Sequence, residues 1–434
     1  MRYHVGAEGE GGVNVQANST EEDLEIRAQA EQLKRGIQAV VPENGLEDKL
    51  ALSKREKRPL RIKLGLDPTA PDIHLGFAVV LRKLRQFQDM GHQVVIIIGD
   101  YTALIGDPSG RSATRPMLSA EEIKKNAETY VDQLARILQR ERTEVRFNGE
   151  WLGKLDFAEV VKLAAHMTVA QVLQRDDFAN RFGAHQPISL HELLYPLAQA
   201  YDSVAIRADI EMGGQDQTFN ILAGRDLQRE MGQAPQAAMF MPLLVGLDGH
   251  KKMSKSLGNY VGISEDPVVM FSKIMSLSDE AMKEYFVLCT DVPLDEVEML
   301  LAESTTGRTN PRDVKRRLAK EIVTIYHGDA PSVAADDEWM RVHSAGEVPQ
   351  DMPVMGYDAA ISKAGTVWVC KLLVTVGLAT GTGEARRLVQ QGAVSVNGEK
   401  VPSSEWEPQA GELDGTVLKV GAKRYVKLQR NSQH

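Results

Sequence analysis

The sequence predicts an α/β protein: a Rossmann-like domain built on a parallel sheet, followed by an α-helical domain and a small α+β domain. Three observations predict this arrangement. Strand patterns and helix patterns alternate from about residue 60, the pattern from about 264 to 340 is helical throughout, and the last part mixes short helices with a hairpin signal. A chain of 434 residues is also too long for one hydrophobic core.

The alternation begins with a β-α-β unit. PLRIKLGLDP (59–68) predicts a strand, VVLRKLRQFQDMG (79–91) a helix that ends at a glycine, and HQVVIIIGD (92–100) a fully buried strand. Such a unit predicts a parallel sheet with a right-handed crossover, and a ligand crevice at the carboxyl ends of the strands. The stretches GLDPTAPDIHLGF (65–77) and GDYTALIGDPSGR (99–111) both fall at that edge.

Helical, loop-broken sequence follows, so we expect a helical insertion at about 118–195. The alternation then resumes: SVAIRADIEMGG (203–214) predicts a strand with a Gly-Gly turn, and MFMPLLVGLDG (239–249) predicts another buried strand. In the last part, the dipeptide Asn397-Gly398 is a strong β-hairpin signal. The predicted division is a flexible tail, a first domain with the insertion, a helical domain, a linker and a last domain, at residues 1–17, 18–263, 264–345, 346–356 and 357–434.

The composition indicates an ordinary soluble globular protein, with 43% hydrophobic residues and a net charge of −9. The two cysteines, Cys289 and Cys370, lack metal-ligand spacing, which favours reduced thiols and a cytoplasmic location. No apolar run is long enough for a signal peptide or a membrane span. From residue 358 to 434, ten basic residues face seven acidic ones; this local charge of +3 leaves −12 for the rest and weakly favours a nucleic-acid partner.

Two motifs predict a nucleotide site. HLGF (74–77) follows a strand and opens a helix, so its glycine allows close backbone approach while free N–H groups at the helix N-terminus face a phosphate. KKMSKSLGN (251–259) follows another strand, and Lys252 and Lys255 suit a loop that neutralises polyphosphate charge. Each motif alone has an ordinary reading, as a loop histidine or a solvated lysine pair. Their occurrence in one alternating α/β segment favours the nucleotide site.

The pair HLGF and KMSKS resembles the two signature motifs of class I aminoacyl-tRNA synthetases. The phrases LIGDPSGRSATRP (104–116) and LLYPLAQAYDSVAIRADIEMGGQDQ (193–217) are similar to the bacterial tyrosyl-tRNA synthetase family, and the resemblance runs from about Leu60 to the C-terminus. It implies that L-tyrosine and ATP form tyrosyl-adenylate and pyrophosphate, and that tyrosine then passes to the 3′ end of tRNA(Tyr). It also implies Mg²⁺ bound with ATP, no metal bound by the protein itself, and a homodimer formed through the middle of the catalytic domain.

The resemblance implies roles for individual residues. Asp202 would accept the hydroxyl of the substrate tyrosine, and the rest of that amino acid would be contacted by Asp107, Tyr195, Gln199 and Gln217. The residues implied at ATP are Gly65, Asp67, His74, Gly76, Phe77, Gly214, Asp216 and Lys255. The groups that contact the γ-phosphate or grip the leaving pyrophosphate would be Thr69, His74, Lys252, Lys255 and Ser256, with mobile contacts from Arg111 and Arg115.

The stretch GLATGTGEARRLVQQGAVSVNGEKV (377–401) resembles a small RNA-binding domain of ribosomal-protein type. The resemblance implies that the last domain binds tRNA phosphates and that the helical domain also contacts tRNA. The ordinary reading is a basic rim on a solubility domain, and the local positive charge favours RNA. The expected phosphate contacts are Arg386, Arg387, Lys400, Lys423, Arg424 and Lys427.

The sequence departs from the family at three positions. Phe77 stands where the family usually carries His, sometimes Asn, and a phenyl ring donates no hydrogen bond to a nucleotide. Lys63 stands where many bacterial members carry a tyrosine that helps bind the substrate hydroxyl, and Ala103 replaces a glycine. Phe77 leaves open a catalytically weakened, synthetase-derived RNA-binding protein. Two further functions stay open: a tryptophan-specific relative, which Asp202 disfavours, and a nucleotidyltransferase of the same superfamily.

Overall fold

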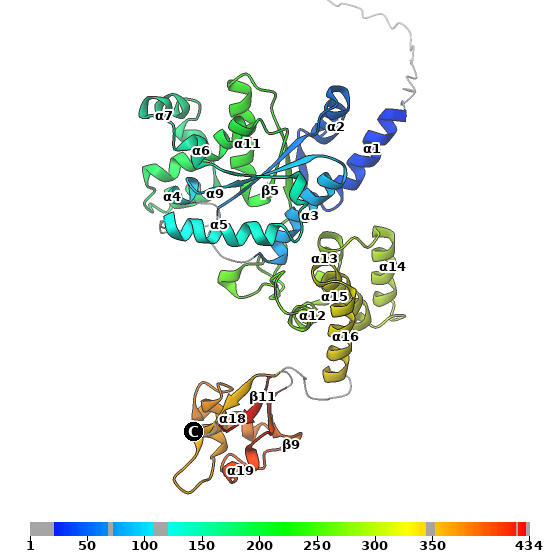
Figure 1. Cartoon of the computed structure of the whole chain (residues 1–434), viewed down its shortest axis with the longest axis vertical. Coiled ribbons are helices and arrows are strands. Elements are labelled where there is room, and N and C mark those ends of the chain that lie inside the picture. The colour runs from blue at the N-terminus through cyan, green and yellow to red at the C-terminus, as the bar shows by residue number, and fades with distance from the viewer. Residues whose placement is uncertain (1–20, 68–72, 107–119, 344–351, 422–423, 431–434) are drawn as a thin grey trace, which may run out of the picture. The chain divides into compact units, whose positions relative to one another are not determined.

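The computed structural model describes residues 21–67, 73–106, 120–343, 352–421 and 424–430. The chain divides into two compact units, Met1–Tyr326 and His327–His434. Within the described residues, the first unit is built on a six-stranded sheet and the second contains a five-stranded sheet (Figure 1). The predicted α/β class with a Rossmann-like sheet is confirmed.

The sheet of the first unit has the order β1-β6-β5-β2-β3-β4. Its neighbouring strands are parallel except for β1, which runs antiparallel to β6 at the edge. Because β2 lies between β3 and β5, the strand order reverses there, and such a reversal opens a crevice at the carboxyl ends of the strands. The strands are β1 (Ala39–Val41), β2 (Arg61–Leu66), β3 (Gln93–Ile98), β4 (Thr143–Phe147), β5 (Ile210–Gly214) and β6 (Ala237–Met241).

Helices cover both sides of this sheet, with α11 on one side and α3 on the other (Figure 1). This double cover explains why β3, with the sequence QVVIII, is buried along nearly its whole length. Helix α3 follows the N-cap residue His74 and ends before Gly91, whose φ of 94° favours glycine. The helices of this part are α1 (Glu21–Lys34), α2 (Gly45–Glu56), α3 (Leu75–Asp89), α4 (Thr102–Ile105), α5 (Ala120–Leu134), α6 (Gly149–Leu152), α7 (Phe157–Ala164), α8 (Val169–Val172), α9 (Asp176–Gly183), α10 (Tyr195–Ile206) and α11 (Thr218–Glu230).

Three expectations about local structure are wrong. Residues 203–206 continue α10 instead of starting a strand, because their β-branched side chains, Val204 and Ile206, are buried as part of the helix, which ends only at Arg207. Strand β4 lies inside the expected helical insertion; its half-buried, charge-rich sequence TEVRF suits an edge strand and shows little apolar pattern. Strand β7 (Val354–Gly356) occupies the end of the expected linker, where it pairs with the last strand of the chain.

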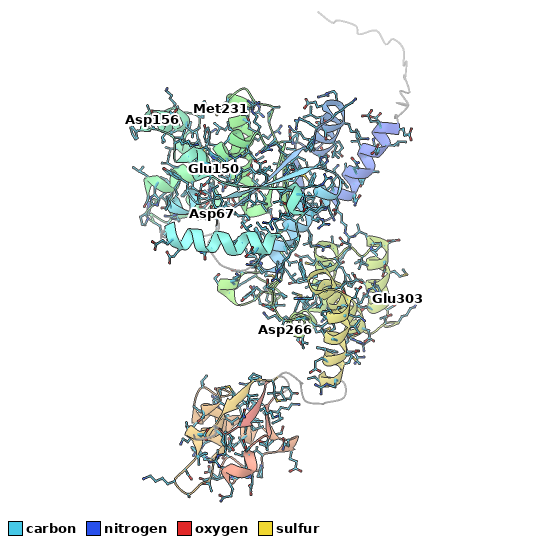
Figure 2. All side chains as sticks on the ribbon, viewed as in Figure 1. Asp67, Glu150, Asp156, Met231, Asp266 and Glu303 are labelled. Atoms are coloured by element: carbon cyan, nitrogen blue, oxygen red, sulfur yellow. The ribbon has the colours of Figure 1, made fainter. Side chains whose placement is uncertain are left out.

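The segment after the sheet is helical, as its pattern predicts. Its first helix, α12, is capped by Asp266, which accepts a hydrogen bond from the N–H of Val268 at 2.9 Å (Figure 2). Asp156, also labelled in Figure 2, caps α7 of the preceding part in the same way, from the N–H of Glu159 at 2.8 Å. No helix in the described ranges is long and apolar enough to cross a membrane. The helices are α12 (Pro267–Met275), α13 (Met282–Cys289), α14 (Leu294–Thr305), α15 (Pro311–His327) and α16 (Asp329–His343).

The sheet of the second unit has the order β7-β11-β10-β8-β9. Strands β8 and β9 form the predicted hairpin, with Asn397 and Gly398 at φ of 49° and 86°, as a type I′ turn requires. Tyr357 lies in the core beneath the sheet, and its hydroxyl donates to the Ala410 carbonyl at 2.6 Å. The remaining elements are α17 (Val369–Thr375), α18 (Thr382–Gln390), β8 (Val394–Val396), β9 (Glu399–Lys400), α19 (Ala410–Leu413), β10 (Val417–Val420) and β11 (Arg424–Gln429).

Candidate active site

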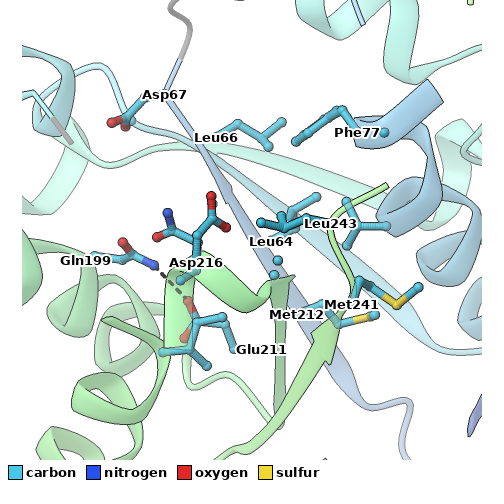
Figure 3. A pocket seen from close by; sticks show the side chains of 18 of the residues that line it. Leu64, Leu66, Asp67, Phe77, Gln199, Glu211, Met212, Asp216, Met241 and Leu243 are labelled. Atoms are coloured by element: carbon cyan, nitrogen blue, oxygen red, sulfur yellow. Dashed lines mark hydrogen bonds between the residues drawn. The ribbon is translucent and has the colours of Figure 1, made fainter. Parts of the chain in front are cut away.

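A cavity of about 390 Å³ opens at the carboxyl ends of β2 and β5, where the strand order reverses. It lies at the edge of the sheet where the β-α-β pattern predicts a ligand crevice. In Figure 3, Leu66 and Phe77 lie on one side of the cavity, and Asp67 and Gln199 lie on the other. The cavity therefore has an apolar wall and a polar wall.

The HLGF and KMSKS motifs meet at this cavity. The N–H of Gly76 donates to the sulfur of Met253, 177 residues away, at 3.3 Å, and the N–H of Leu75 donates to the Val261 carbonyl at 2.8 Å. A β-carbon at position 76 would lie 3.2 Å from Nδ1 of His74 and 3.3 Å from Cβ of Met253. Glycine therefore allows the two motifs to approach this closely.

Asn259 holds the base of the KMSKS loop. Its side-chain oxygen accepts from the N–H of Ser254 at 2.8 Å, and its Nδ2 donates to Asp248 at 2.8 Å and to the Lys252 carbonyl at 3.1 Å. At the outer end of the loop, Lys252 Nζ lies 3.1 Å from the carboxylate of Asp216, and both side chains are partly exposed. A solvated ion pair of this kind contributes little stability, so exchanging it for a contact to a ligand would cost little.

His74 is a neutral hydrogen-bond donor in this site. Its Nδ1 accepts from the N–H of Phe77 at 3.3 Å, which leaves the ring proton on Nε2. Burial, together with the positive charge of nearby Lys255, lowers the pKa of His74 to about 4. At pH 7 the ring therefore offers one N–H to a ligand and carries no positive charge.

Asp67 is held by two hydroxyl donors. Tyr195 donates to Oδ2 and Thr102 donates to Oδ1, each at 2.8 Å. A β-carbon at Gly99 would lie 2.1 Å from this carboxylate, so only glycine leaves room for it. The contact joins Asp67, which we expected at the nucleotide, to Tyr195, which we expected at the amino acid.

Asp202 lines the cavity from α10 and is only 3% exposed. Trp151 Nε1 donates to Oδ1 at 2.8 Å, and Asn148 Nδ2 donates to Oδ2 at 3.3 Å. Burial raises the pKa of Asp202 to about 7, against the lowering effects of the Lys63 charge and of these two donors. A carboxylate oxygen can accept more than one hydrogen bond, so Asp202 retains capacity for a ligand. Trp151 and Asn148 were not predicted from the sequence, because no motif marks them.

Lys63 faces α10 from β2 and is fully buried, with its Nζ 2.9 Å from Oε1 of Glu211 on β5. Glu211 lines the cavity and accepts a long hydrogen bond, 3.5 Å, from Gln199 Nε2 (Figure 3). Glu211 was not predicted from the sequence either. The available signal was a pair of opposite charges, Lys63 and Glu211, at positions inside two strands of the same sheet.

The other expected site residues, together with Ala103, are placed as follows. Those that also line the cavity are Gly65, Gly76, Gly214 and Gln217. Lys255 begins a short 3₁₀ turn, Lys255–Leu257, and the Ser256 hydroxyl lies 2.9 Å from that of Ser254. Ala103 is buried in α4. The residues that lie outside the described part of the chain are Thr69, Asp107, Arg111, Arg115 and Lys423.

The basic side chains expected at tRNA are exposed on the second unit wherever it is described: Arg386, Arg387, Lys400, Arg424 and Lys427. Two of them also contact the protein. Arg386 lies over the ring of Trp368, 5.4 Å from its centroid, and Arg424 Nη1 donates to the Leu378 carbonyl at 2.8 Å. The second contact means that Arg424 also has a structural role in the second unit.

Two family models match the chain: class I tRNA synthetases (W and Y) over residues 54–343, and the SYY-like C-terminal domain of tyrosine-tRNA ligases over residues 347–428. A tyrosine-tRNA ligase of Moorella thermoacetica is 52% identical over 406 residues, which cover 94% of this chain and 97% of that protein. The chain belongs to the tyrosine-tRNA ligase family. The tyrosine-tRNA ligase of Haemophilus influenzae is 48% identical, over 92% of this chain and 96% of its own length.

The fold of the tyrosine-tRNA ligase family also appears in a solved structure. The tyrosyl-tRNA synthetase of Archaeoglobus fulgidus, complexed with L-tyrosine, superposes with a TM-score of 0.57 at 20% sequence identity. The match covers 72% of this chain and 99% of that one. At this identity the likeness concerns the fold alone.

Proposed function

We propose that this chain is a working tyrosine-tRNA ligase, which uses ATP to join L-tyrosine to tRNA(Tyr). One observation carries the proposal: the buried acceptor Asp202 and the docked HLGF and KMSKS motifs line the same cavity. A phenol hydroxyl needs an acceptor in a pocket with little water, and a polyphosphate needs N–H donors and lysines. A tryptophan-specific enzyme fits less well, because the indole N–H lies at a different place on its ring. An RNA-binding relative without catalysis has no use for this cavity.

The amino-acid end of the cavity consists of Tyr195, Gln199, Asp202 and Glu211. We assign the tyrosine hydroxyl to Asp202. The ammonium group is assigned to Tyr195 and Gln199 together with Asp107, and the carboxyl region to Gln217. Because Tyr195 donates its proton to Asp67, its hydroxyl oxygen can act towards an ammonium group only as an acceptor.

The nucleotide end of the cavity consists of His74, Phe77, Asp216 and Lys252. A carboxylate oxygen of tyrosine attacks the α-phosphorus of ATP, a new P–O bond forms, the bond to the bridging oxygen of the β-phosphate breaks, and pyrophosphate leaves. The protein supplies position and charge, not a nucleophile. The groups assigned to the phosphates are Thr69, His74 through Nε2, Lys252, Lys255, Ser256, Arg111 and Arg115, and those assigned to the ribose side are Gly65, Asp67, Gly76, Gly214 and Asp216.

Mg²⁺ enters this scheme with ATP, as part of the substrate. Within the described residues, no group of three or more His, Cys, Asp or Glu side chains is arranged to hold a metal ion. In the proposal, the phosphate oxygens of ATP supply the ligands of the ion. Its charge would add to that of the lysines in stabilising the leaving pyrophosphate.

In the second step, a hydroxyl of the terminal tRNA adenosine attacks the carbonyl carbon of tyrosyl-adenylate, an ester forms and AMP leaves. The helical segment and the basic side chains of the second unit would hold the tRNA through its phosphates. Deleting residues 350–434 should leave tyrosine activation nearly intact and remove most tRNA charging. Measuring both activities on the truncated chain tests this, and loss of activation together with charging would contradict it.

A homodimer and a cytoplasmic location complete the proposal. Large apolar side chains in the stretch between α6 and α10 are exposed, among them Phe157 and Leu190, each 83% exposed, and Phe182. Apolar side chains exposed to this degree suit an interface between two copies of the chain. The two cysteines, Cys289 and Cys370, are free and buried, which fits a reducing compartment.

The test of the activity is amino-acid-dependent exchange of pyrophosphate into ATP, measured with tyrosine, tryptophan and phenylalanine. Exchange with tyrosine alone supports the proposal. Exchange with tryptophan would identify a tryptophan enzyme, and no exchange despite tRNA binding would identify a non-catalytic RNA-binding protein. Charging of tRNA(Tyr) in the same preparation then tests the second step.

A further inference from the structure

Lys63 and Glu211 form a buried ion pair beneath the amino-acid end of the cavity. They are direct neighbours in the parallel pairing of β2 with β5. Their side chains are 0% and 1% exposed, and Nζ of Lys63 lies 2.9 Å from Oε1 of Glu211. Lys63 occupies a position where many bacterial members of the family carry a tyrosine that helps to bind the substrate hydroxyl.

Lys63 has no donor left for a substrate. An ammonium group has three N–H donors. The contacts of this one are the Gln199 carbonyl at 3.0 Å, the Ser203 hydroxyl at 2.7 Å and Glu211 at 2.9 Å. Glu211 is likewise hydrogen-bonded within the protein, because its Oε2 accepts from the Ser203 hydroxyl at 2.8 Å and from the Gln236 side chain. The role of the pair is therefore exerted through the residues that it holds.

Apart from the ion pair itself and the contact to Gln236, these hydrogen bonds reach one turn of α10. Gln199 and Ser203 begin and end that turn, and Asp202 lies within it. A buried ion pair generally contributes little net stability compared with apolar side chains of the same volume, because two charges lose their hydration. A contribution to stability therefore does not explain why the ion pair is present. Positioning α10 against β2 and β5 does explain it.

We propose that Lys63 and Glu211 are positioning residues for amino-acid recognition: they fix the Gln199–Ser203 turn of α10 against the sheet, and they hold the positive charge of Lys63 next to the turn that carries Asp202, the assigned acceptor of the substrate hydroxyl. The inference rests on the proposed assignment of that hydroxyl to Asp202. Discrimination against phenylalanine then depends on a pair of residues that never touch the substrate.

The charges that face Asp202 come from several elements. Lys63 on β2 lowers the pKa of Asp202, and Glu211 on β5 raises it. From the β4–α6 region, Trp151 and Asn148 donate hydrogen bonds that lower it. Two further charged groups contact the donors of Asp202 and not Asp202 itself. Arg146 lies over the Trp151 ring, 5.5 Å from its centroid, and Asp67 is linked to Asn148 through Thr102.

The signs of these effects predict how two single variants and the double variant should differ in pH dependence. Lys63→Met removes a positive charge, so the pKa of Asp202 should rise, and recognition of tyrosine should then need a higher pH. Glu211→Gln removes a negative charge, so the same transition should move to lower pH. The double variant removes both charges, and its transition should return close to that of the unchanged chain.

The experiment measures kcat/KM for tyrosine and for phenylalanine in pyrophosphate exchange by the full chain, between about pH 5.5 and 8.5. Lys63→Met should lower kcat/KM for tyrosine at pH 7 at least tenfold, with partial recovery at higher pH and little change for phenylalanine. Lys83→Met is the matched control, because Lys83 is also a buried lysine but contacts Gln86, away from the cavity. It should leave the tyrosine-to-phenylalanine ratio unchanged.

Equal losses for both amino acids, with an unmoved pH transition, would overturn the proposal in favour of a purely structural role. If Lys63→Met fails to fold, the opposite shift expected for Glu211→Gln decides the question, and an unmoved transition in that variant overturns the proposal. Asp202→Asn tests the underlying assignment separately. If the ratio of kcat/KM for tyrosine to that for phenylalanine is unchanged in that variant, Asp202 does not bind the substrate hydroxyl. This outcome is independent of the result for Lys63.

Discussion

The two ends of the cavity are built in different ways. At the amino-acid end, Asp202, Lys63 and Glu211 are almost fully buried, and their hydrogen-bond partners lie on strands, on α10 and in the β4–α6 region. At the nucleotide end, Lys252 and Asp216 are partly exposed and meet in a solvated ion pair on a loop. Selection of a side chain requires a fixed, desolvated acceptor, whereas stabilising a departing polyphosphate requires charges that move with it.

The largest expected effect is at the buried end. Asp202→Asn replaces a carboxylate by a neutral amide. The NH₂ group of that amide would face one of the two donors, Trp151 or Asn148, that now bind the carboxylate. A hydrogen bond to a charged group contributes about 1.5–3 kcal/mol, so kcat/KM for tyrosine should fall by about tenfold to a hundredfold or more, with little change for phenylalanine. Pyrophosphate exchange with each amino acid measures this. The exposed Asp226→Asn is the charge control, and equal losses for both substrates would refute the assignment.

A smaller loss, of a different kind, is expected at the exposed end. Lys255→Ala should slow adenylate formation by at least about tenfold and leave tyrosine affinity unchanged, because a lysine that grips a leaving polyphosphate acts mainly in the transition state. Single-turnover kinetics with a separate measurement of tyrosine binding distinguish these. The neighbouring Lys251→Ala, also exposed on this loop, is the control. Weakened tyrosine binding in the Lys255 variant would mean that the two ends are not independent.

Phe77 sharpens the comparison, because it places an apolar ring at the charged end. The ring is partly exposed to the cavity, so histidine at this position would meet a ligand or water and not a closed core. Phe77→His should therefore raise the rate of adenylate formation by about tenfold, the scale of one hydrogen bond, without changing tyrosine affinity. Phe77→Leu, which adds no donor, should give no gain. A slower or less stable Phe77→His would show that the apolar wall has adapted to the ring.

The exposed end was easier to predict from sequence than the buried end. HLGF and KMSKS are contiguous motifs whose glycine and lysines carry their chemistry locally, and the β-α-β periodicity of β2, α3 and β3 places them at one edge of the sheet. The donors to Asp202 come from a stretch about 50 residues away that no motif marks, directly after the edge strand β4, which itself shows little apolar pattern. Lys63 and Glu211 are far apart in sequence, and only strand pairing makes them neighbours.

The smallest expected effect is a dependence of activity on pH that comes from the amino-acid end of the cavity and not from the nucleotide end. His74, with a pKa of about 4, does not titrate between about pH 5.5 and 8.5, whereas Asp202, with a pKa of about 7, does. As the pH falls below 7, Asp202 gains a proton and becomes a weaker acceptor. From pH 8 to pH 6, kcat/KM for tyrosine should therefore fall severalfold, up to about tenfold, while that for phenylalanine changes little.

Stability should change in the opposite direction. The pKa of Asp202 is raised from 3.8 in the unfolded chain to about 7 in the folded one, so between these values the folded state binds more protons. The free energy of unfolding must then decrease as the pH rises from about 4 to 7, and increase as it falls. The difference in melting temperature between the unchanged chain and Asp202→Asn isolates this group, since other titrating residues cancel. Towards pH 6 that difference should move in favour of the unchanged chain while its selectivity for tyrosine declines. A difference that stays constant with pH would mean that Asp202 remains ionised throughout, and that the charge at the buried end is held more firmly than its burial implies.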